Sequence, residues 1–122
     1  MTATEVLRKY KSHGLPEFYG IKLKDVNQRS HFGNVALHIA ATRGNLEDVK
    51  ALMEGGADIN IRGEDGYSPL QDAVTQGKLE VVRLLLMNHA DLSTVTDFGE
   101  SALEIAQNHG YDEIVIILKS YL

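Results

Sequence analysis

The feature that most constrains this chain is a pattern of residue types that returns every 33 positions. The stretch from Gly66 to Gly77 contains a turn glycine, a Ser-Pro pair that suits a helix start, a face of small residues and a closing glycine. The same types recur one step earlier and one step later, at Gly33/Gly66/Gly99, Leu37/Leu70/Leu103, Ala40/Ala73/Ala106, Gly44/Gly77/Gly110, Val49/Val82/Val115 and Leu52/Leu85/Leu118. A fixed period of this length indicates a stacked repeat architecture.

Each repeat predicts a polar loop followed by two short helices. The first helices are expected near residues 35–43, 68–76 and 101–109, and the second helices near residues 46–55, 79–88 and 112–121. Alanines on the first helix allow a neighbouring helix to approach closely, whereas the second helix carries the larger apolar residues. One such helix pair cannot bury its apolar face alone, so we expect the units to stack into an all-α solenoid.

Residues 1–24 do not follow the 33-residue register and are predicted to form an N-terminal helical cap. Thr2 and Glu5 fit a capping box for a helix over residues 1–14. Residues 15–24 are predicted to be an irregular or short helical packing segment. The register resumes at residue 25, so the repeats are expected to occupy residues 25–122.

The last unit carries substitutions that suit the end of a stack. Gln107 and Lys119 stand where the earlier units have apolar residues, which predicts a polar outer face. Ile116 does not fit this interpretation, because the charged Arg83 occupies the same position one unit earlier. An exposed contact is the only role that the pattern offers for Ile116.

These repeats resemble the ankyrin repeat, a unit of 33 residues with a Thr-Pro-Leu-His-x-Ala signature. The signature has counterparts here in Val-Ala-Leu-His-Ile-Ala at 35–40, Ser-Pro-Leu-Gln-Asp-Ala at 68–73 and Ser-Ala-Leu-Glu-Ile-Ala at 101–106. The Gly-Ala-Asp-Ile-Asn sequence at 56–60 is similar to the end of the family unit. The resemblance implies an ankyrin solenoid of three full helix-turn-helix units, at about residues 30–62, 63–95 and 96–122.

The departures from the family signature lead to one expectation about stability. Only the middle unit keeps the proline, as Pro69, and only the first keeps the histidine, as His38. In the family, the threonine and histidine of the signature connect neighbouring loops. We therefore expect thinner hydrogen bonding between the loops of this chain. Three full units plus a partial cap are close to the minimum for a stable stack, so we also expect modest stability.

Composition is that of an ordinary globular protein, with 43% apolar and 24% charged residues. No apolar run approaches the roughly 18 residues that would indicate a membrane-spanning helix, so no membrane association is expected. The N-terminus lacks the basic flank and apolar core of a signal peptide. Without cysteine, the chain cannot form a disulfide or a thiolate metal site. Together these features favour a soluble cytoplasmic protein, and the alternative is a location outside the cell, where a chain without cysteine could also survive.

The net charge of −5 is unevenly distributed. Residues 1–24 contain five basic and two acidic residues, a net charge of +3, which leaves −8 on the remainder. An acidic body repels phosphate backbones, so we expect no nucleic acid and instead a partner protein with a basic surface. The alternative is that these charges only keep the surface soluble.

Several short motifs suggest chemistry that the rest of the chain does not support. Asp97-Phe98-Gly99 spells the magnesium-binding triplet of protein kinases, but the Gly-rich loop, strand lysine and catalytic loop are missing. The five histidines form no recognised metal motif, and no Gly-x-Ser-x-Gly elbow is present. We expect no enzymatic activity, no metal site and no cofactor.

In ankyrin stacks, the loop tips and the exposed side of the first helices form a concave recognition surface. The resemblance places partner-binding residues at Arg29, His31, Phe32, Asn34, Thr42, Arg43, Arg62, Glu64, Asp65, Tyr67, Thr75, Gln76, Val95, Asp97, Phe98, Glu100, Asn108 and His109. Among them, Phe32, Tyr67 and Phe98 are candidate aromatic anchors. The alternative is that each ring folds back onto a neighbouring loop.

The resemblance implies a non-catalytic protein that binds, and as a narrower hypothesis inhibits, another protein. Some stand-alone bacterial ankyrin proteins are antidotes that neutralise toxins of the same cell, and an acidic surface would suit a basic toxin. The alternatives are a scaffold or adaptor subunit and, third, a nucleic-acid or nucleotide binder, which would need a basic groove with stacking aromatics. We expect a monomer when the protein is free.

Overall fold

The computed structural model describes residues 1–20 and 25–122 of the chain. Its elements are α1 (Ala3–Ser12), η1 (Pro16–Phe18), α2 (Ala36–Arg43), α3 (Leu46–Glu54), η2 (Glu64–Gly66), α4 (Pro69–Thr75), α5 (Leu79–Met87), α6 (Ala102–His109) and α7 (Asp112–Ser120), where η denotes a 3-10 helix. The predicted all-α class is confirmed for this part of the chain, where the β-pairing consists of an isolated bridge between Val95 and Ser101. Of the predicted packing segment 15–24, residues 16–18 form η1, and residues 21–24 lie outside the described residues.

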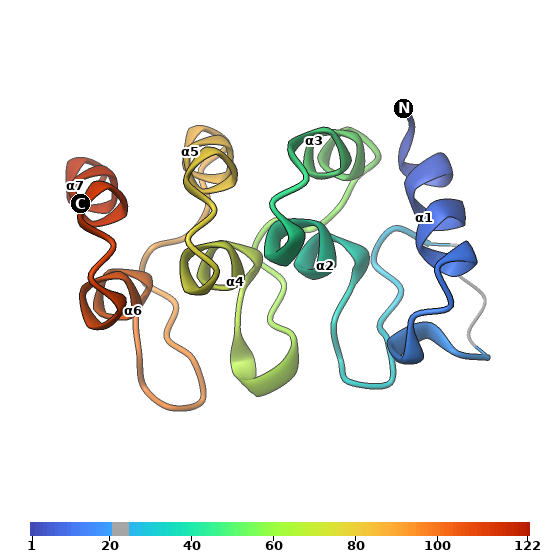
Figure 1. The fold of residues 1–122 in the computed structure, drawn as a ribbon, viewed down its shortest axis with the longest axis horizontal. Helices are drawn as coiled ribbons and strands as arrows, with labels where there is room; N and C mark the ends of the chain where they lie inside the picture. Colours follow the sequence, from blue (N-terminus) through green and yellow to red (C-terminus); the bar gives the residue numbers. More distant parts are fainter. Residues whose placement is uncertain (21–24) are drawn as a thin grey trace.

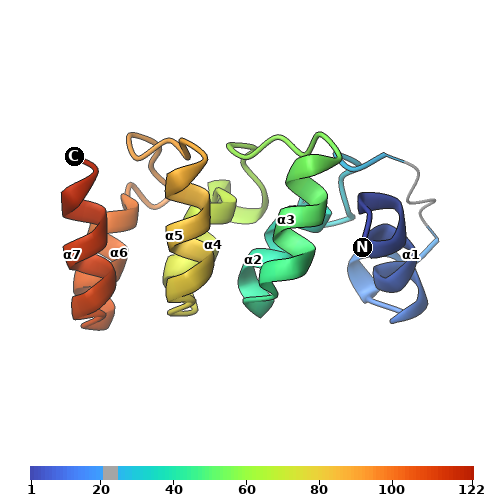
Figure 2. The same ribbon diagram turned by 90° about the horizontal axis from the view of Figure 1, so that it is seen from above.

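The helices form a solenoid with two rows (Figure 1). Helices α2, α4 and α6 pack against one another in one row, and α3, α5 and α7 form the second row. Each first helix also packs against the second helix of its own unit. The three long loops that precede α2, α4 and α6 project in the same direction, away from the second row (Figure 1), and Figure 2 shows the rows from above.

Local sequence explains where the first helices begin and end. The Ser68 hydroxyl accepts a hydrogen bond from the N–H of Gln71, the Gln71 side-chain oxygen accepts one from the Ser68 N–H, and Pro69 occupies the first turn. At the other end, Gly44 and Gly110 close α2 and α6 in the left-handed conformation, with φ of 72° and 71°. The alternation of polar loop, first helix and second helix follows the predicted register.

Small residues allow the first helices to pack closely. Ala40, Ala73 and Ala106, which share one register position, are all fully buried. The larger core residues Leu52 and Leu85 are likewise fully buried in the second row. Truncation of a buried leucine to alanine typically costs about 2–5 kcal/mol of stability, so we expect Leu52→Ala or Leu85→Ala to destabilise the stack by an amount in this range.

The C-terminal unit exposes the residues that the sequence identifies as polar substitutions. Gln107 on α6 and Lys119 on α7 are both exposed, as expected for the outer face of a terminal unit. Ile116 is also exposed, with 68% of its surface accessible. The position therefore faces solvent in this unit as in the previous one, and nothing in the structure explains its apolar side chain.

The N-terminal segment attaches to the first repeat through a buried polar cluster. Helix α1 packs against α3 and buries Val6, Leu7 and Tyr10. The Tyr10 hydroxyl donates a hydrogen bond of 2.9 Å to the Asp48 carboxylate, and the Lys9 ammonium lies 2.7 Å from the same carboxylate. Asp48 is only 1% exposed, so these two partners satisfy a charge that would otherwise be costly to bury.

Tyr10 gives this attachment a predictable pH dependence. Burial, reinforced by the hydrogen bond and the negative charge of Asp48, raises the pKa of Tyr10 far above its ordinary value of 10.0. Above pH 10 the folded protein therefore keeps a proton that the unfolded chain loses. The free energy of unfolding should fall by about 1.4 kcal/mol per pH unit from this group alone.

The control is Tyr10→Phe, which keeps the ring and removes the ionisable group. Urea unfolding from pH 7 to pH 11 should show a shallower loss of stability for Tyr10→Phe than for the unchanged protein, because the other tyrosines and the lysines contribute equally to both. Parallel pH profiles would show that Tyr10 ionises in the folded state as it does in the unfolded state.

Candidate functional site

An open groove of about 420 Å³ lies between the first and second repeat units, on the side of the projecting loops. Its walls come from α2, α4, the η2 loop and the segment that follows α1. The lining residues are Leu15, Asn34, His38, Ile39, Thr42, Arg43, Glu64, Asp65, Tyr67, Asp72 and Gln76. A groove of this size is within the range that protein pockets use to bury ligand groups.

The groove brings together only part of the predicted surface. The predicted residues in its lining are Asn34, Thr42, Arg43, Glu64, Asp65, Tyr67 and Gln76. The other predicted residues, which lie outside this lining, are Arg29, His31, Phe32, Arg62, Thr75, Val95, Asp97, Phe98, Glu100, Asn108 and His109. The predicted set therefore divides into groove residues, loop residues, Thr75 at the end of α4, and the end of α6.

Sequence reasoning missed Leu15, His38, Ile39 and Asp72 as lining residues. Asp72 could have been found, because it lies on α4 one helical turn before Gln76, the C-cap residue of this helix, and so shares its face. Leu15 could not, because it belongs to the segment outside the repeat register. His38 and Ile39 are buried and contribute to the groove floor.

The groove has opposite charges at its two sides. Partial burial raises the pKa of Tyr67, and the negative charges of Glu100, Asp72 and Asp65 raise it further. On the side of the N-terminal cap, Arg43 supplies positive charge. The carboxylates around Tyr67 thus create a negative potential on the side of α4 and the η2 loop.

The cap holds the Arg43 side chain in place. Its guanidinium carbon lies 4.9 Å from the centre of the Tyr10 ring, a favourable cation–π arrangement. One guanidinium nitrogen is also 3.2 Å from Nδ1 of His13, at the end of α1. The N-terminal cap therefore positions one wall of the groove as well as covering the end of the stack.

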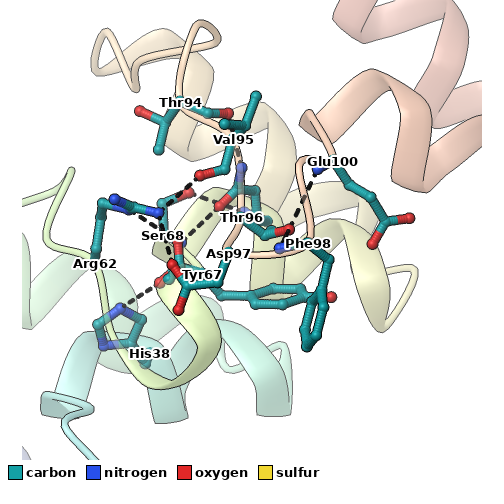
Figure 3. Close-up of polar contacts among 12 residues, drawn as sticks. His38, Arg62, Tyr67, Ser68, Thr94, Val95, Thr96, Asp97, Phe98 and Glu100 are labelled. Carbon is teal, nitrogen blue, oxygen red and sulfur yellow. Dashed lines mark hydrogen bonds and ion pairs between the residues drawn. The ribbon is translucent and has the colours of Figure 1, made fainter.

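His38 connects the first unit to the second. Its Nδ1 accepts a 2.9 Å hydrogen bond from the Val35 N–H, so the proton of a neutral ring resides on Nε2. Nε2 lies 2.9 Å from the Ile61 carbonyl oxygen and 3.1 Å from the Tyr67 carbonyl oxygen, and its N–H is shared between these two acceptors. Figure 3 shows the contact with Tyr67. This one side chain joins a helix start to two points of the next loop.

Gln71 makes equivalent contacts one unit later. Its Oε1 accepts a 2.8 Å hydrogen bond from the Ser68 N–H, and its Nε2 donates one of 2.8 Å to the Thr94 carbonyl. An amide offers an acceptor and a donor, as a neutral imidazole does. The expectation of thinner hydrogen bonding is therefore wrong for this unit, because Gln71 replaces both functions of the histidine.

Two arginines add a second connection between the loops. Arg29 donates hydrogen bonds to the carbonyls of Gly33 and Arg62, at 2.7 and 2.8 Å. Arg62 donates to the Val95 carbonyl at 3.0 Å and forms a 3.2 Å ion pair with Asp97 (Figure 3). Both arginines, which were predicted to contact a partner, therefore hold adjacent loops together in the free protein.

The three candidate aromatic anchors differ in exposure. Phe32 and Phe98 are 52% and 67% exposed at their loop tips. Tyr67 is only partly exposed and packs against the hydrophobic core. Figure 3 shows the rings of Tyr67 and Phe98 projecting to the same side of the loops. The alternative of a ring that folds back thus applies to Tyr67, and the two phenylalanines remain available.

Comparison with known protein families agrees with this architecture. A family model described as ankyrin repeats in three copies matches residues 5–96 and, in an overlapping alignment, residues 37–121. The chain belongs to the ankyrin repeat family. Ankyrin repeats generally mediate protein–protein interactions and are typically non-catalytic. A search of curated proteins found no match.

The described part of this ankyrin protein provides little for other kinds of site. Asp97 of the kinase-like triplet is ion-paired with Arg62, and its N–H donates to the Asp65 carbonyl, so it belongs to the contacts between loops. Within residues 1–20 and 25–122, no group of three or more histidine or acidic side chains is placed to hold a metal ion. None of the helices described is both long and apolar enough to cross a membrane.

Gln71 provides a direct test of how this ankyrin stack is joined. Gln71→Ala should lower the free energy of unfolding by about 1–3 kcal/mol, because it leaves the Ser68 N–H and the Thr94 carbonyl without their partner. Gln71→His should remain close to the unchanged protein, since His38 makes the equivalent contacts in the first unit. Urea denaturation would measure both, and equal losses for the two variants would contradict the proposed equivalence.

Proposed function

We propose that this ankyrin protein binds a partner protein through a concave face made of the 420 Å³ groove and the adjacent loop tips. The observation that carries the proposal is the combination of a hollow with a negatively charged wall and two exposed phenylalanines on the projecting loops. Aromatic residues, phenylalanine included, are enriched in protein interfaces relative to the rest of the surface. Polar groups in the groove would supply orientation and specificity.

The connected loops favour binding by a surface that is already formed. His38, Gln71 and the two arginines fix each loop against the next, so association would order few additional groups. Because ordering flexible groups on binding costs free energy, a preformed surface retains more of the contact energy as affinity. This favours a binding role for the face.

The charge of the groove supports a partner with a basic surface. Glu64, Asp65 and Asp72 line the groove together with one cation, Arg43. Complementary charge raises the association rate and excludes partners of the same sign. A nucleic-acid or nucleotide ligand is a weaker candidate, since its phosphates would meet these carboxylates.

A narrower hypothesis is that the protein inhibits its partner, as an antidote does to a toxin with a basic surface. The acidic groove supports this role only in part, because a scaffold or adaptor subunit could use the same face. We place the protein in the cytoplasm and consider it a monomer when free. Adding the purified protein to an activity assay of the identified partner separates the two roles, since a scaffold would leave the activity unchanged.

Site-specific photo-crosslinking tests which face binds. A photoreactive amino acid at Gln76, in the groove, should crosslink to a partner in an extract of the source cells. The same group at Arg83, exposed on α5 in the other row, serves as the matched control. Crosslinking from Arg83 alone, or equally from both positions, would contradict binding through the groove.

Salt dependence provides an independent measurement once the partner is known. Raising the salt concentration from 50 to 300 mM should weaken binding by about tenfold or more, because screening reduces the attraction between the acidic groove and a basic surface. Binding titrations at the two concentrations would measure the change. An affinity that does not depend on salt would rule out the basic partner, while leaving a binding role for the face.

A further inference from the structure

The three projecting loops place one residue each at the same register position: Phe32, Asp65 and Phe98. Tyr67 does not belong to this set, because its equivalents are Asn34 and Glu100. Phe32, Asp65 and Phe98, which we call the tip row, are all exposed. The row therefore alternates aromatic, acidic and aromatic along the stack.

The two outer tips share one backbone arrangement. The Ser30 hydroxyl accepts a hydrogen bond of 3.2 Å from the Phe32 N–H, and the Thr96 hydroxyl accepts one of 3.2 Å from the Phe98 N–H. Ser30 and Thr96 are both buried, so each tip is anchored from within. The two phenylalanines are thus held by the same local turn, two units apart.

The middle tip is built differently because Gly63 occupies the position of the anchoring hydroxyl. A Cβ atom at Gly63 would collide with the Asn34 side chain and the His38 ring, so a serine or threonine there would require both side chains to shift. This loop instead turns through η2 and places Asp65 at a φ of 57°, a conformation that aspartate tolerates better than most residues. Among the described residues, Asp65 forms no ion pair.

Hydrogen bonds fix the three tips relative to one another. The Asn34 side-chain oxygen, in the first loop, accepts a 2.9 Å hydrogen bond from the Glu64 N–H in the second. The Asp65 carbonyl accepts another, also 2.9 Å, from the Asp97 N–H in the third. The tip row is therefore part of the connected loop surface.

The spacing of the row restricts the kind of partner that can contact all three tips. Packed helices lie about 8–10 Å apart, and each projecting loop leads into one helix of the first row (Figure 1), so we take about 10 Å as the spacing of successive tips. An α-helix rises 1.5 Å per residue and advances about 10 Å in seven residues. A helix lying along the row would therefore place residues i, i+7 and i+14 opposite the three successive tips. Residues seven apart lie on the same face of a helix.

We infer that the tip row selects a helix of the partner that carries an apolar, a basic and an apolar side chain at seven-residue spacing. The apolar side chains cover Phe32 and Phe98, and the basic one pairs with Asp65. The inference rests on the proposed binding function and specifies the partner element for that face. The negative charge of Asp65 requires a basic residue at the central position of the partner helix, and the two flanking phenylalanines require apolar residues on either side of it.

Selection from a phage-displayed library of helical peptides tests this inference. The peptides would have positions i, i+7 and i+14 randomised on an otherwise constant helical sequence. Selection for binding to the unchanged protein should enrich apolar residues at i and i+14, and lysine or arginine at i+7. Failure to enrich any binder, or enrichment without a basic preference at i+7, would overturn the inference.

Variants of the row separate a specific contact from general attraction. Asp65→Lys should reverse the preference at i+7 to acidic residues, and Phe32→Ala combined with Phe98→Ala should remove the apolar preferences. Asp65→Asn is the conservative control, since asparagine also tolerates the left-handed conformation. Circular dichroism and thermal unfolding confirm that each variant is folded.

Peptide titrations then quantify the central contact. Replacing lysine by glutamine at i+7 should weaken binding to the unchanged protein by about fivefold, as expected for an exposed ion pair, and should not affect binding to Asp65→Asn. An equal loss with both proteins would refute the pairing. Crosslinking from Gln76 that persists alongside such a result would leave the proposed function intact and reject only the tip row.

Discussion

The structure depends on side chains of one repeat that hydrogen-bond to the backbone of the next loop. His38 and Gln71 reach carbonyls about one unit ahead, and Arg29 and Arg62 do the same closer to the tips. A loop of this length without such partners would leave backbone groups to the solvent and move independently. Each of these contacts is to a backbone carbonyl, so the side chain has only to supply an N–H donor at the right place. Glutamine supplies one as histidine does, and it can therefore replace histidine without loss of the connection.

The N-terminal cap performs a similar function with different chemistry. It lies outside the register and, in addition to a 2.7 Å hydrogen bond between His31 Nε2 and the Tyr19 carbonyl, relies on the Asp48 carboxylate with Tyr10 and Lys9 as partners. An Asp48 without both partners would be a buried charge with a large desolvation cost. The cluster therefore restricts how α1 can dock, and through Arg43 it also shapes one wall of the groove.

The periodic part of the fold was predictable, because burial and capping depend on residues close together in sequence. The helix positions, the buried alanines and the exposed Gln107 and Lys119 all follow from the 33-residue register. Contacts that join distant residues were not predictable. Nothing local indicates that Asp48 is buried against Tyr10, or that Gln71 reaches Thr94. In the candidate site, the acidic character was evident from sequence, but the role of Arg29 and Arg62 depends on loop-to-loop geometry.

The last loop differs from the others because its register positions lack the donors. Val95 stands where Arg29 and Arg62 stand in earlier units, and Glu104 replaces His38 and Gln71, so neither side chain can donate to a further carbonyl. The third loop is consequently held by the second, through Arg62, Gln71 and the Asp65 carbonyl. The position of Phe98 thus depends on residues of the preceding unit. A substitution in the middle repeat would therefore change the proposed binding surface of the last repeat without altering any residue of that repeat, so the joined set of loops acts as one unit in the proposed binding.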